Sequence, residues 1–165
     1  AMHFNTRYIC TQQNWFGGGM DVTPSKLDEI EKKDFHKILK KMCNRHNKNY
    51  YKKYKKWCDD YFYLPHRKEP RGIGGIFFDY KKNDFEKDFK FVIDLGITFQ
   101  FIFNKIIQKK INKKWTSRDK EMQYVKRGRY AEFNLLYDRG TKFGLQTGGN
   151  VEAILMSLPP LAKWK

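Results

Sequence analysis

Polar and apolar residues alternate at the start of the chain. Between residues 1 and 16, the polar residues His3, Asn5 and Arg7 alternate with apolar neighbours. This period of two is typical of a strand or hairpin. The run Gly17–Gly19 interrupts the alternation, so the sequence predicts that the strand region ends there.

Apolar spacing changes to a helical period farther along the chain. Thr23 and Pro24 favour a helix start, with Thr as the N-cap and Pro at the first position. Thr116 or Ser117 favours another start in the same way. The predicted helices run from Pro24 through Met42, over about Tyr50–Tyr63, over Phe85–Lys110, and from Thr116 or Ser117 to about Lys126.

Several later segments predict strands. Ile76–Phe78 is a short apolar run, and Tyr130–Tyr137 and Lys142–Gln146 fit two antiparallel strands joined by the glycine-containing turn 138–141. Val151–Leu158 fits either a strand or a helix. With no internal repeat or linker, residues 1–165 are predicted to form one α+β domain, an antiparallel sheet packed against helices.

Composition supports a folded protein and argues against a membrane span and a secretion leader. Of the 165 residues, 40% are apolar and 17% aromatic, enough for a hydrophobic core. The longest near-apolar window, Phe89–Ile107, is interrupted by charged residues, so we expect no membrane span and, from the first residues, no secretion leader. Cys10, Cys43 and Cys58 form no CxxC pair, which favours free thiols in a reducing, cytoplasmic compartment.

The formal net charge of +16 is the strongest bulk signal. Such a charge attracts polyanions, so a basic module that binds nucleic acid is one alternative. Many lysines, however, occur in blocks such as Lys52-Lys53 and Lys113-Lys114, which are typical of solvated helix faces. The charge alone therefore does not choose between a nucleic acid and a small polyanion as partner.

Candidate chemistry is sparse when residue types are considered alone. Glycines cluster at 17–19, 72–75 and 148–149, where they favour tight turns or close approach to a ligand. The second cluster follows His66, Arg67 and Arg71, and arginines suit carboxylate recognition. None of the four histidines belongs to a metal-binding motif. From these residues the sequence predicts a basic, aromatic-rich domain that could bind a small polyanion.

Longer segments resemble, in order, successive blocks of the oxygen-dependent coproporphyrinogen III oxidases. The matching segments are His3-Phe-Asn-Thr-Arg-Tyr8, Trp15-Phe-Gly-Gly-Gly-Met-Asp-Val-Thr-Pro24, Lys55–Tyr63, His66-Arg67, Glu69-Pro-Arg-Gly-Ile-Gly-Gly-Ile-Phe-Phe-Asp79, Arg127-Gly-Arg-Tyr-Ala-Glu-Phe-Asn134, Tyr137–Gly149 and Ile154–Pro160. They cover nearly the whole chain, and the run from Arg127 to Thr141 is the most distinctive.

The resemblance implies an activity and an architecture. The family converts two propionates of coproporphyrinogen III to vinyl groups, giving protoporphyrinogen IX for haem synthesis, with molecular oxygen as oxidant and carbon dioxide and hydrogen peroxide as products. No metal or organic cofactor is expected, although a divalent metal has been proposed for some bacterial members. The implied fold is a flat antiparallel sheet covered by helices on both faces, assembled as a homodimer through about Tyr130–Leu155.

The resemblance also implies site residues. Arg7 matches an arginine that contacts substrate and would clamp a propionate, Asp21 would accept hydrogen bonds from pyrrole N–H groups, and His3 matches a proton donor. Further positions matching substrate contacts are Asn5, Thr6, Gly148, Gly149 and Asn150. The positions matching proposed metal ligands are His3, His36 and His66.

Two departures from the family pattern bear on activity. Asn150 stands where the family usually has an arginine, which removes one charged contact to a carboxylate. Family chains also continue upstream of His3 and beyond Trp164, so we expect this chain to be a fragment lacking the N-terminal part and the extreme C-terminus. An inactive remnant that still binds tetrapyrrole is therefore a further alternative.

Overall fold

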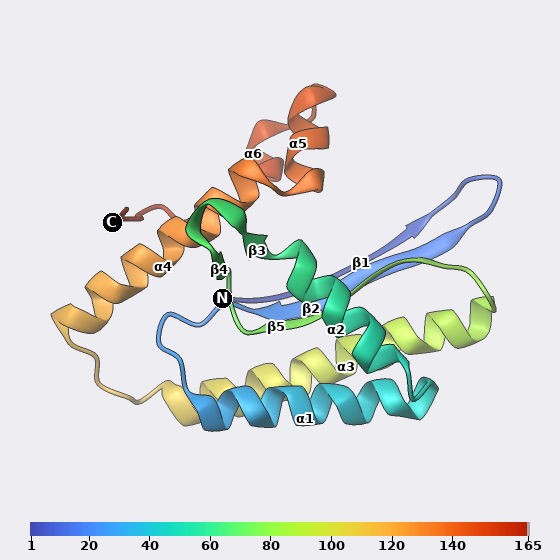
Figure 1. Cartoon of the computed structure of the whole chain (residues 1–165), viewed down its shortest axis with the longest axis horizontal. Helices are drawn as coiled ribbons and strands as arrows, with labels where there is room; N and C mark the ends of the chain where they lie inside the picture. Colours follow the sequence, from blue (N-terminus) through green and yellow to red (C-terminus); the bar gives the residue numbers. More distant parts are fainter. Residues whose placement is uncertain (165) are drawn as a thin grey trace.

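A computed structural model describes residues 1–164 of the chain as a mixture of helices and short sheets (Figure 1). In chain order the elements are β1 (Met2–Ile9), β2 (Trp15–Val22), α1 (Glu29–His46), α2 (Tyr50–Tyr61), β3 (Tyr63–Leu64), the 3-10 helix η1 (Pro65–Arg67), β4 (Glu69–Pro70), β5 (Gly74–Lys81), α3 (Phe85–Lys110), α4 (Ser117–Leu136), α5 (Arg139–Gln146) and α6 (Val151–Ile154).

The main sheet is antiparallel and has the strand order β1-β2-β5, while β3 and β4 form a separate two-stranded ladder. Gly17–Gly19 lie inside β2, so the predicted break at these glycines is wrong. Glycine is tolerated here because β2 is the central strand, with ladder bonds on both sides. A Cβ on Gly19 would lie 2.7 Å from the carbonyl oxygen of Ile76, so the close approach of β2 and β5 requires glycine.

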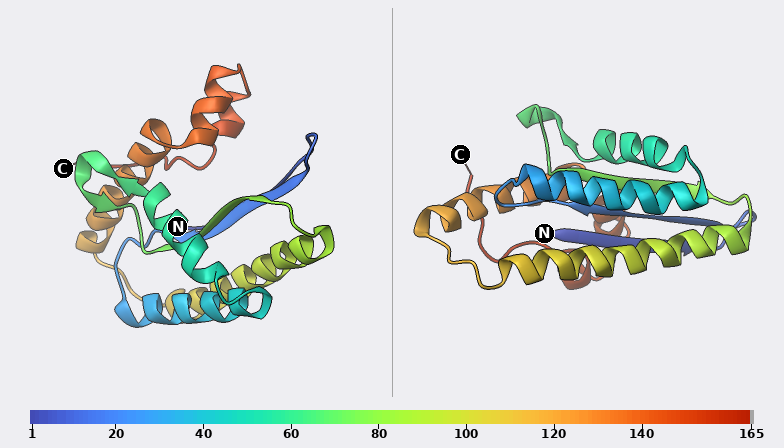
Figure 2. Two further views of the ribbon diagram at one scale, coloured as in Figure 1. Left: turned by 45° about the vertical axis from the view of Figure 1, so that its right-hand side comes forward. Right: turned by 90° about the horizontal axis from the view of Figure 1, so that it is seen from below.

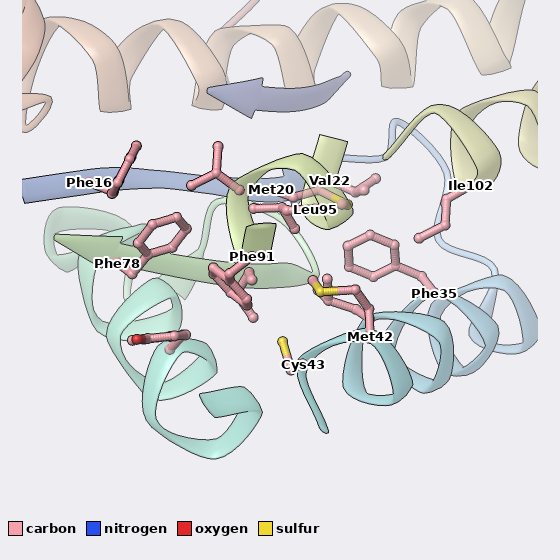
Figure 3. Packing of buried hydrophobic residues seen from close by; sticks show 14 residues of the cluster. Phe16, Met20, Val22, Phe35, Met42, Cys43, Phe78, Phe91, Leu95 and Ile102 are labelled. Atoms are coloured by element: carbon pink, nitrogen blue, oxygen red, sulfur yellow. The ribbon is translucent and has the colours of Figure 1, made fainter. Parts of the chain in front are cut away.

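One face of the sheet carries the hydrophobic core. Helices α1, α2 and α3 bury their apolar sides against it (Figures 2 and 3). The core residues from β2 and β5 are Phe16, Met20, Val22, Ile76 and Phe78, and those from the helices are Phe35, Leu39, Met42, Cys43, Tyr54, Phe91, Val92, Leu95 and Ile102. Helix α4 lies against the other face, where Tyr130 stacks on His3, so the predicted α+β architecture, an antiparallel sheet with helices on both faces, is confirmed.

Helix α1 begins later than the sequence predicts. Its N-cap is Asp28, whose carboxylate accepts hydrogen bonds from the backbone N–H groups of Ile30 and Glu31 at 3.0 and 3.1 Å. The predicted cap, Thr23, is buried in the connection from β2. Because a carboxylate satisfies two free N–H groups of the first turn, Asp28 is the stronger start signal. The prediction of α3 over Phe85–Lys110 is confirmed.

The C-terminal third is helical where the sequence predicts strands. Thr116 and Asp119 form a capping box that starts α4, and the helix continues to Leu136 instead of ending near Lys126. The predicted strands over Tyr130–Tyr137 and Lys142–Gln146 are therefore wrong. No proline occurs between Ser117 and Asp138, and the single glycine there, Gly128, lies within the helix. Asp138 caps α5 by accepting a hydrogen bond from the backbone N–H of Thr141 at 2.7 Å. The ambiguous segment 151–158 contains the short helix α6.

Helix α3 exposes many apolar side chains on the side that does not face the core. They include Phe85, Phe89, Ile93, Ile97 and Phe101. By length and composition this helix could cross a membrane, with 28% of its most apolar window buried. Core helices pass the same criterion, so this is weak evidence, and the absence of a membrane span stays a prediction.

A buried ion pair supplies a test of how the sheet is anchored to α3. The Lys81 ammonium contacts Asp88 Oδ1 and donates to the Tyr50 hydroxyl at 2.8 Å, and the side chains of Lys81 and Asp88 are each 3% exposed. Asp88→Ala would leave a buried charge without its partner. We expect the free energy of unfolding, measured by urea denaturation, to fall by about 3–5 kcal/mol.

Two further variants separate pairing from packing. The double variant Lys81→Met, Asp88→Leu removes both charges and should recover most of the loss. Asp60→Ala, which breaks the exposed pair between Lys56 and Asp60, should change stability little. Equal losses for Asp88→Ala and Asp60→Ala would contradict the buried-pair argument.

Candidate active site

The second face of the sheet brings together four of the predicted site residues. In the β1–β2 register, His3 lies opposite Asp21 and Arg7 lies opposite Gly17. Side chains two residues apart share a face, so His3, Asn5 and Arg7 of β1 and Asp21 of β2 all lie on the face away from the core. Thr6 has the opposite parity and therefore lies on the core side.

Asp21 is the buried centre of the first cluster. Its side chain accepts a hydrogen bond from His3 Nδ1 at 3.3 Å, and Arg71 Nη2 donates to the same oxygen, Oδ2. Burial raises the pKa of Asp21, but the charge of Arg71 and the His3 hydrogen bond outweigh it and hold that pKa below its ordinary value. An ionised carboxylate only accepts, so Nδ1 of His3 carries the proton and Nε2 remains for other chemistry.

Aromatic rings fix both partners of Asp21. The Arg71 guanidinium lies 3.9 Å from the ring centre of Phe62 and 4.9 Å from that of Phe133, a cation–π arrangement that holds it in place. Tyr130 of α4 stacks on the His3 ring with 5.1 Å between centroids and 10° between planes. The sequence prediction missed this contact because it placed Tyr130 in a strand.

Arg7 forms a second cluster with Asp79 of β5. Arg7 Nε donates to Asp79 Oδ1 at 3.0 Å, and Nη2 contacts the same oxygen. Arg139 Nη2, at the start of α5, lies 3.9 Å from Asp79 Oδ2. The remaining Arg7 nitrogen, Nη1, donates to Asn5 Oδ1 at 3.4 Å. The sequence prediction did not include Asp79. Alternation along β5 places Asp79 on the same face as Gly75, and Gly75 lies opposite Asp21 in the β2–β5 register.

The predicted contacts Gly148, Gly149 and Asn150 do not touch either cluster. They form the turn between α5 and α6, where Asn150 Oδ1 caps α6 by accepting from the N–H of Ala153 at 3.2 Å. The nearest neighbours of a Cβ on Gly149 are Gly144 and Ile154. The structure thus separates this turn from β1 and β2, and its role as a substrate contact stays a prediction.

The histidines predicted as metal ligands lie on different elements with partners of their own. His36 Nε2 donates to the Ile73 carbonyl oxygen at 2.9 Å, and its Nδ1 accepts from the Tyr51 hydroxyl at 3.0 Å. Burial lowers the pKa of His36. His66 bonds to Glu132 and Tyr137, and His3 bonds to Asp21.

These positions do not fit a shared metal. Within residues 1–164, no group of three or more His, Cys, Asp or Glu side chains is arranged to hold a metal ion. Metal dependence therefore stays a prediction.

Glu132 of α4 organises a third polar cluster, between that helix and η1. It is 8% exposed and receives His66 Nε2 at 2.8 Å and Arg67 Nε at 3.0 Å, with Arg129 Nη1 at 3.4 Å. The hydrogen bond from Arg67 is the main cause that lowers the pKa of Glu132 to about 2. This cluster joins η1 to α4 and so fixes the helix that carries Tyr130.

Fold and site together define an α+β domain whose open sheet face combines a buried carboxylate, a histidine and several arginines. The sequence matches the family model of coproporphyrinogen III oxidase over residues 1–165. The chain belongs to the coproporphyrinogen III oxidase family.

Curated relatives agree with this assignment. The chain is 58% identical over 165 residues to the oxygen-dependent coproporphyrinogen-III oxidase of Rickettsia bellii (strain OSU 85-389), and 57% identical to that of Rickettsia akari (strain Hartford). Each match covers 99% of this chain and 59% of the relative. The chain thus spans 59% of the length of these relatives.

The pKa of Glu132 gives a pH-dependent prediction. It lies near 2 in the folded protein, below its ordinary value of 4.5, so its ionisation favours folding above pH 4.5. That contribution is lost as the pH falls towards 2. We expect Glu132→Gln to flatten the pH dependence of the unfolding free energy between these values, measured by denaturant titrations at several pH values. The exposed Glu86→Gln is the control, and an unchanged slope in Glu132→Gln would refute the assignment.

Proposed function

We propose that this chain carries the substrate-binding sheet of an oxygen-dependent coproporphyrinogen III oxidase. From each of two propionates the reaction removes the carboxylate as carbon dioxide and a hydride equivalent from the carbon attached to the pyrrole ring, next to the carbon that carried the carboxylate. Each hydride, with one proton, reduces one molecule of oxygen to hydrogen peroxide, leaving a vinyl group. The observation that carries the proposal is the meeting of His3, Arg7 and Asp21 on one sheet face in a member of this family.

Arg7 is proposed to bind a propionate of the substrate. Its guanidinium is partly exposed, and Nη1 donates to the Asn5 amide oxygen, a weak partner that a carboxylate can replace. Charge-assisted bonds to a carboxylate are stronger than bonds to an amide. Binding a propionate at this edge orients the neighbouring carbon for the reaction.

Asp21 is proposed to accept hydrogen bonds from pyrrole N–H groups. His3 and Arg71 both bond to Oδ2, so Oδ1 is the oxygen offered to the macrocycle. A low pKa keeps the group ionised at neutral pH, and a nearby negative charge favours loss of a hydride from an electron-rich ring. Arg71 holds this carboxylate in place through its hydrogen bond to Oδ2.

His3 is proposed to move the proton that the reduction of oxygen requires. Because Nδ1 is committed to Asp21, the proton transfer would occur at Nε2. Tyr130 stacks on the ring and limits its rotation, so Nε2 keeps one direction relative to Asp21.

The remaining expectations are part of the same proposal. Coproporphyrinogen III and oxygen are the substrates, no metal or organic cofactor takes part, and the protein acts in the cytoplasm as a homodimer. The proposed dimer segment, Tyr130–Leu155, consists of the end of α4 with α5 and α6, so packing between copies would use helices. Gly148–Asn150, in that segment, is proposed to contact a propionate far from Arg7.

Turnover under air is the direct test. The chain alone and the chain joined to the additional segments of the Rickettsia bellii relative are supplied with coproporphyrinogen III in air. We expect the joined protein to release one carbon dioxide and one hydrogen peroxide for every vinyl group formed. A folded joined protein that gives no vinyl product would refute the activity. Steeply salt-dependent binding to single-stranded nucleic acid without porphyrinogen turnover would favour the alternative module.

Substitutions test the proposed roles of Arg7 and Asp21. Arg7→Ala and Asp21→Asn should each lower kcat/KM by at least about tenfold, since each removes a charged contact. Asn is chosen at position 21 because it preserves the hydrogen bonds that hold Arg71. Asp60→Asn on the exposed side of α2 is the matched control. Unchanged kinetics in both site variants, each shown to be folded at the assay temperature, would contradict the site.

A further inference from the structure

Asp79 is a buried carboxylate held between two arginines from distant parts of the chain. Its side chain is 8% exposed, Oδ1 binds Arg7 of β1, and Oδ2 faces Arg139 at the start of α5. Gly17 makes this possible, because a Cβ there would lie 2.2 Å from Asp79 Oδ1 and 2.7 Å from Arg7 Nε. The glycine leaves the space in which the cluster forms.

The cluster carries a net positive charge. Two guanidinium groups surround one carboxylate, so one positive charge is in excess. Arg139 is 61% exposed and Arg7 is 33% exposed, so the excess charge faces solvent, whereas Asp79 is covered. Arg7 also lies over the Phe77 ring, 5.4 Å from its centre, and Arg139 lies over the Tyr61 ring at 4.9 Å. Both guanidinium planes are thus directed by a ring and by the same carboxylate.

We propose that Asp79 is a positioning residue that aims Arg7 at a substrate carboxylate and holds Arg139 beside it. Using Nε and Nη2 of Arg7, Asp79 fixes the plane of the guanidinium and leaves Nη1 as the donor for the ligand. This inference rests on the proposed function for the identity of the carboxylate, which belongs to a propionate of a tetrapyrrole. Asp79 itself does not touch the substrate.

The direction in which one substitution changes the affinity for a polyanion distinguishes positioning from a simple effect of charge. Asp79→Asn removes a negative charge next to the anion site, so electrostatics alone predicts tighter binding of a polyanion. Positioning predicts weaker binding, by about tenfold, because Arg7 loses its fixed orientation. The measurement is the Kd of coproporphyrin III, a tetracarboxylate stable in air, for the joined protein. Its tetramethyl ester, which has no carboxylates, should bind both forms equally.

A double-mutant cycle shows whether Asp79 acts through Arg7. In an Arg7→Ala background, Asp79→Asn should change the Kd less than twofold, because the Arg7 guanidinium that Asp79 aims is no longer present. Gly17→Ala keeps every charge but displaces the pair, so it should also weaken binding of the tetracarboxylate, and it serves if Asp79→Asn does not fold. Asp60→Asn is the control for the loss of a paired aspartate.

Each outcome decides the inference. Tighter or unchanged binding in Asp79→Asn, an equal loss with and without Arg7, or no binding of coproporphyrin III by the wild type would overturn it. If the wild type binds the tetracarboxylate but forms no vinyl product, the proposed function fails while the Asp79 inference is still tested. If the joined protein forms the vinyl product but Asp79→Asn binds coproporphyrin III as tightly as the wild type, the proposed function stands and the Asp79 inference fails.

Discussion

The buried ion pair between Asp21 and Arg71 connects the parts of the molecule on which the site depends. Asp21 belongs to the central strand, whereas Arg71 follows β4 and donates its own backbone N–H to the Phe62 carbonyl at 3.0 Å. The Arg71 side chain also packs against Tyr130 and Phe133 of α4. One guanidinium therefore holds the sheet, the β3–β4 ladder and α4 together. Because both charges are buried, neither can lose the other without a large cost.

This dependence explains why a carboxylate can stay ionised where burial opposes it. A buried acid alone would be neutral at physiological pH. At Asp21 the arginine below and the histidine beside it reverse that tendency, and the rings of Phe62, Tyr130 and Phe133 exclude water from the arginine. The stability of the fold thus sustains the charge that the proposed chemistry uses. A surface carboxylate would be ionised as well, but it would not have a fixed direction.

The sequence predicted the strand and helix types where periodicity is strong, and it failed where tertiary context decides. The apolar spacing of Phe85–Lys110 and the cap at Thr116 were sufficient for α3 and for the start of α4. Gly17–Gly19 misled because a central strand with partners on both sides tolerates glycine. Tyr130–Tyr137 misled because aromatic residues also favour strands, whereas here Tyr130 and Phe133 line one side of a helix.

The site was predictable only in part for a related reason. Alternation along β1 was enough to place His3 and Arg7 on one face, and the family resemblance singled out Asp21. Asp79 and Tyr130 could not be found in this way, because their importance depends on pairs 72 and 127 positions apart in the sequence. Such contacts are created by the sheet register and by the docking of α4 rather than by any local pattern.

The triple glycine of β2 gives the clearest link between fold and site. A side chain at Gly18, on the core face, would strike the backbone carbonyl oxygen of Asn5. A side chain at Gly17, on the other face, would displace Asp79 and Arg7. Gly17 and Gly19 are buried and leave this face of β2 without side chains between Asp21 and the position opposite Arg7. The same glycines that mislead a strand prediction are thus required by the close pairing of β2 with both neighbours and by the Asp79–Arg7 cluster.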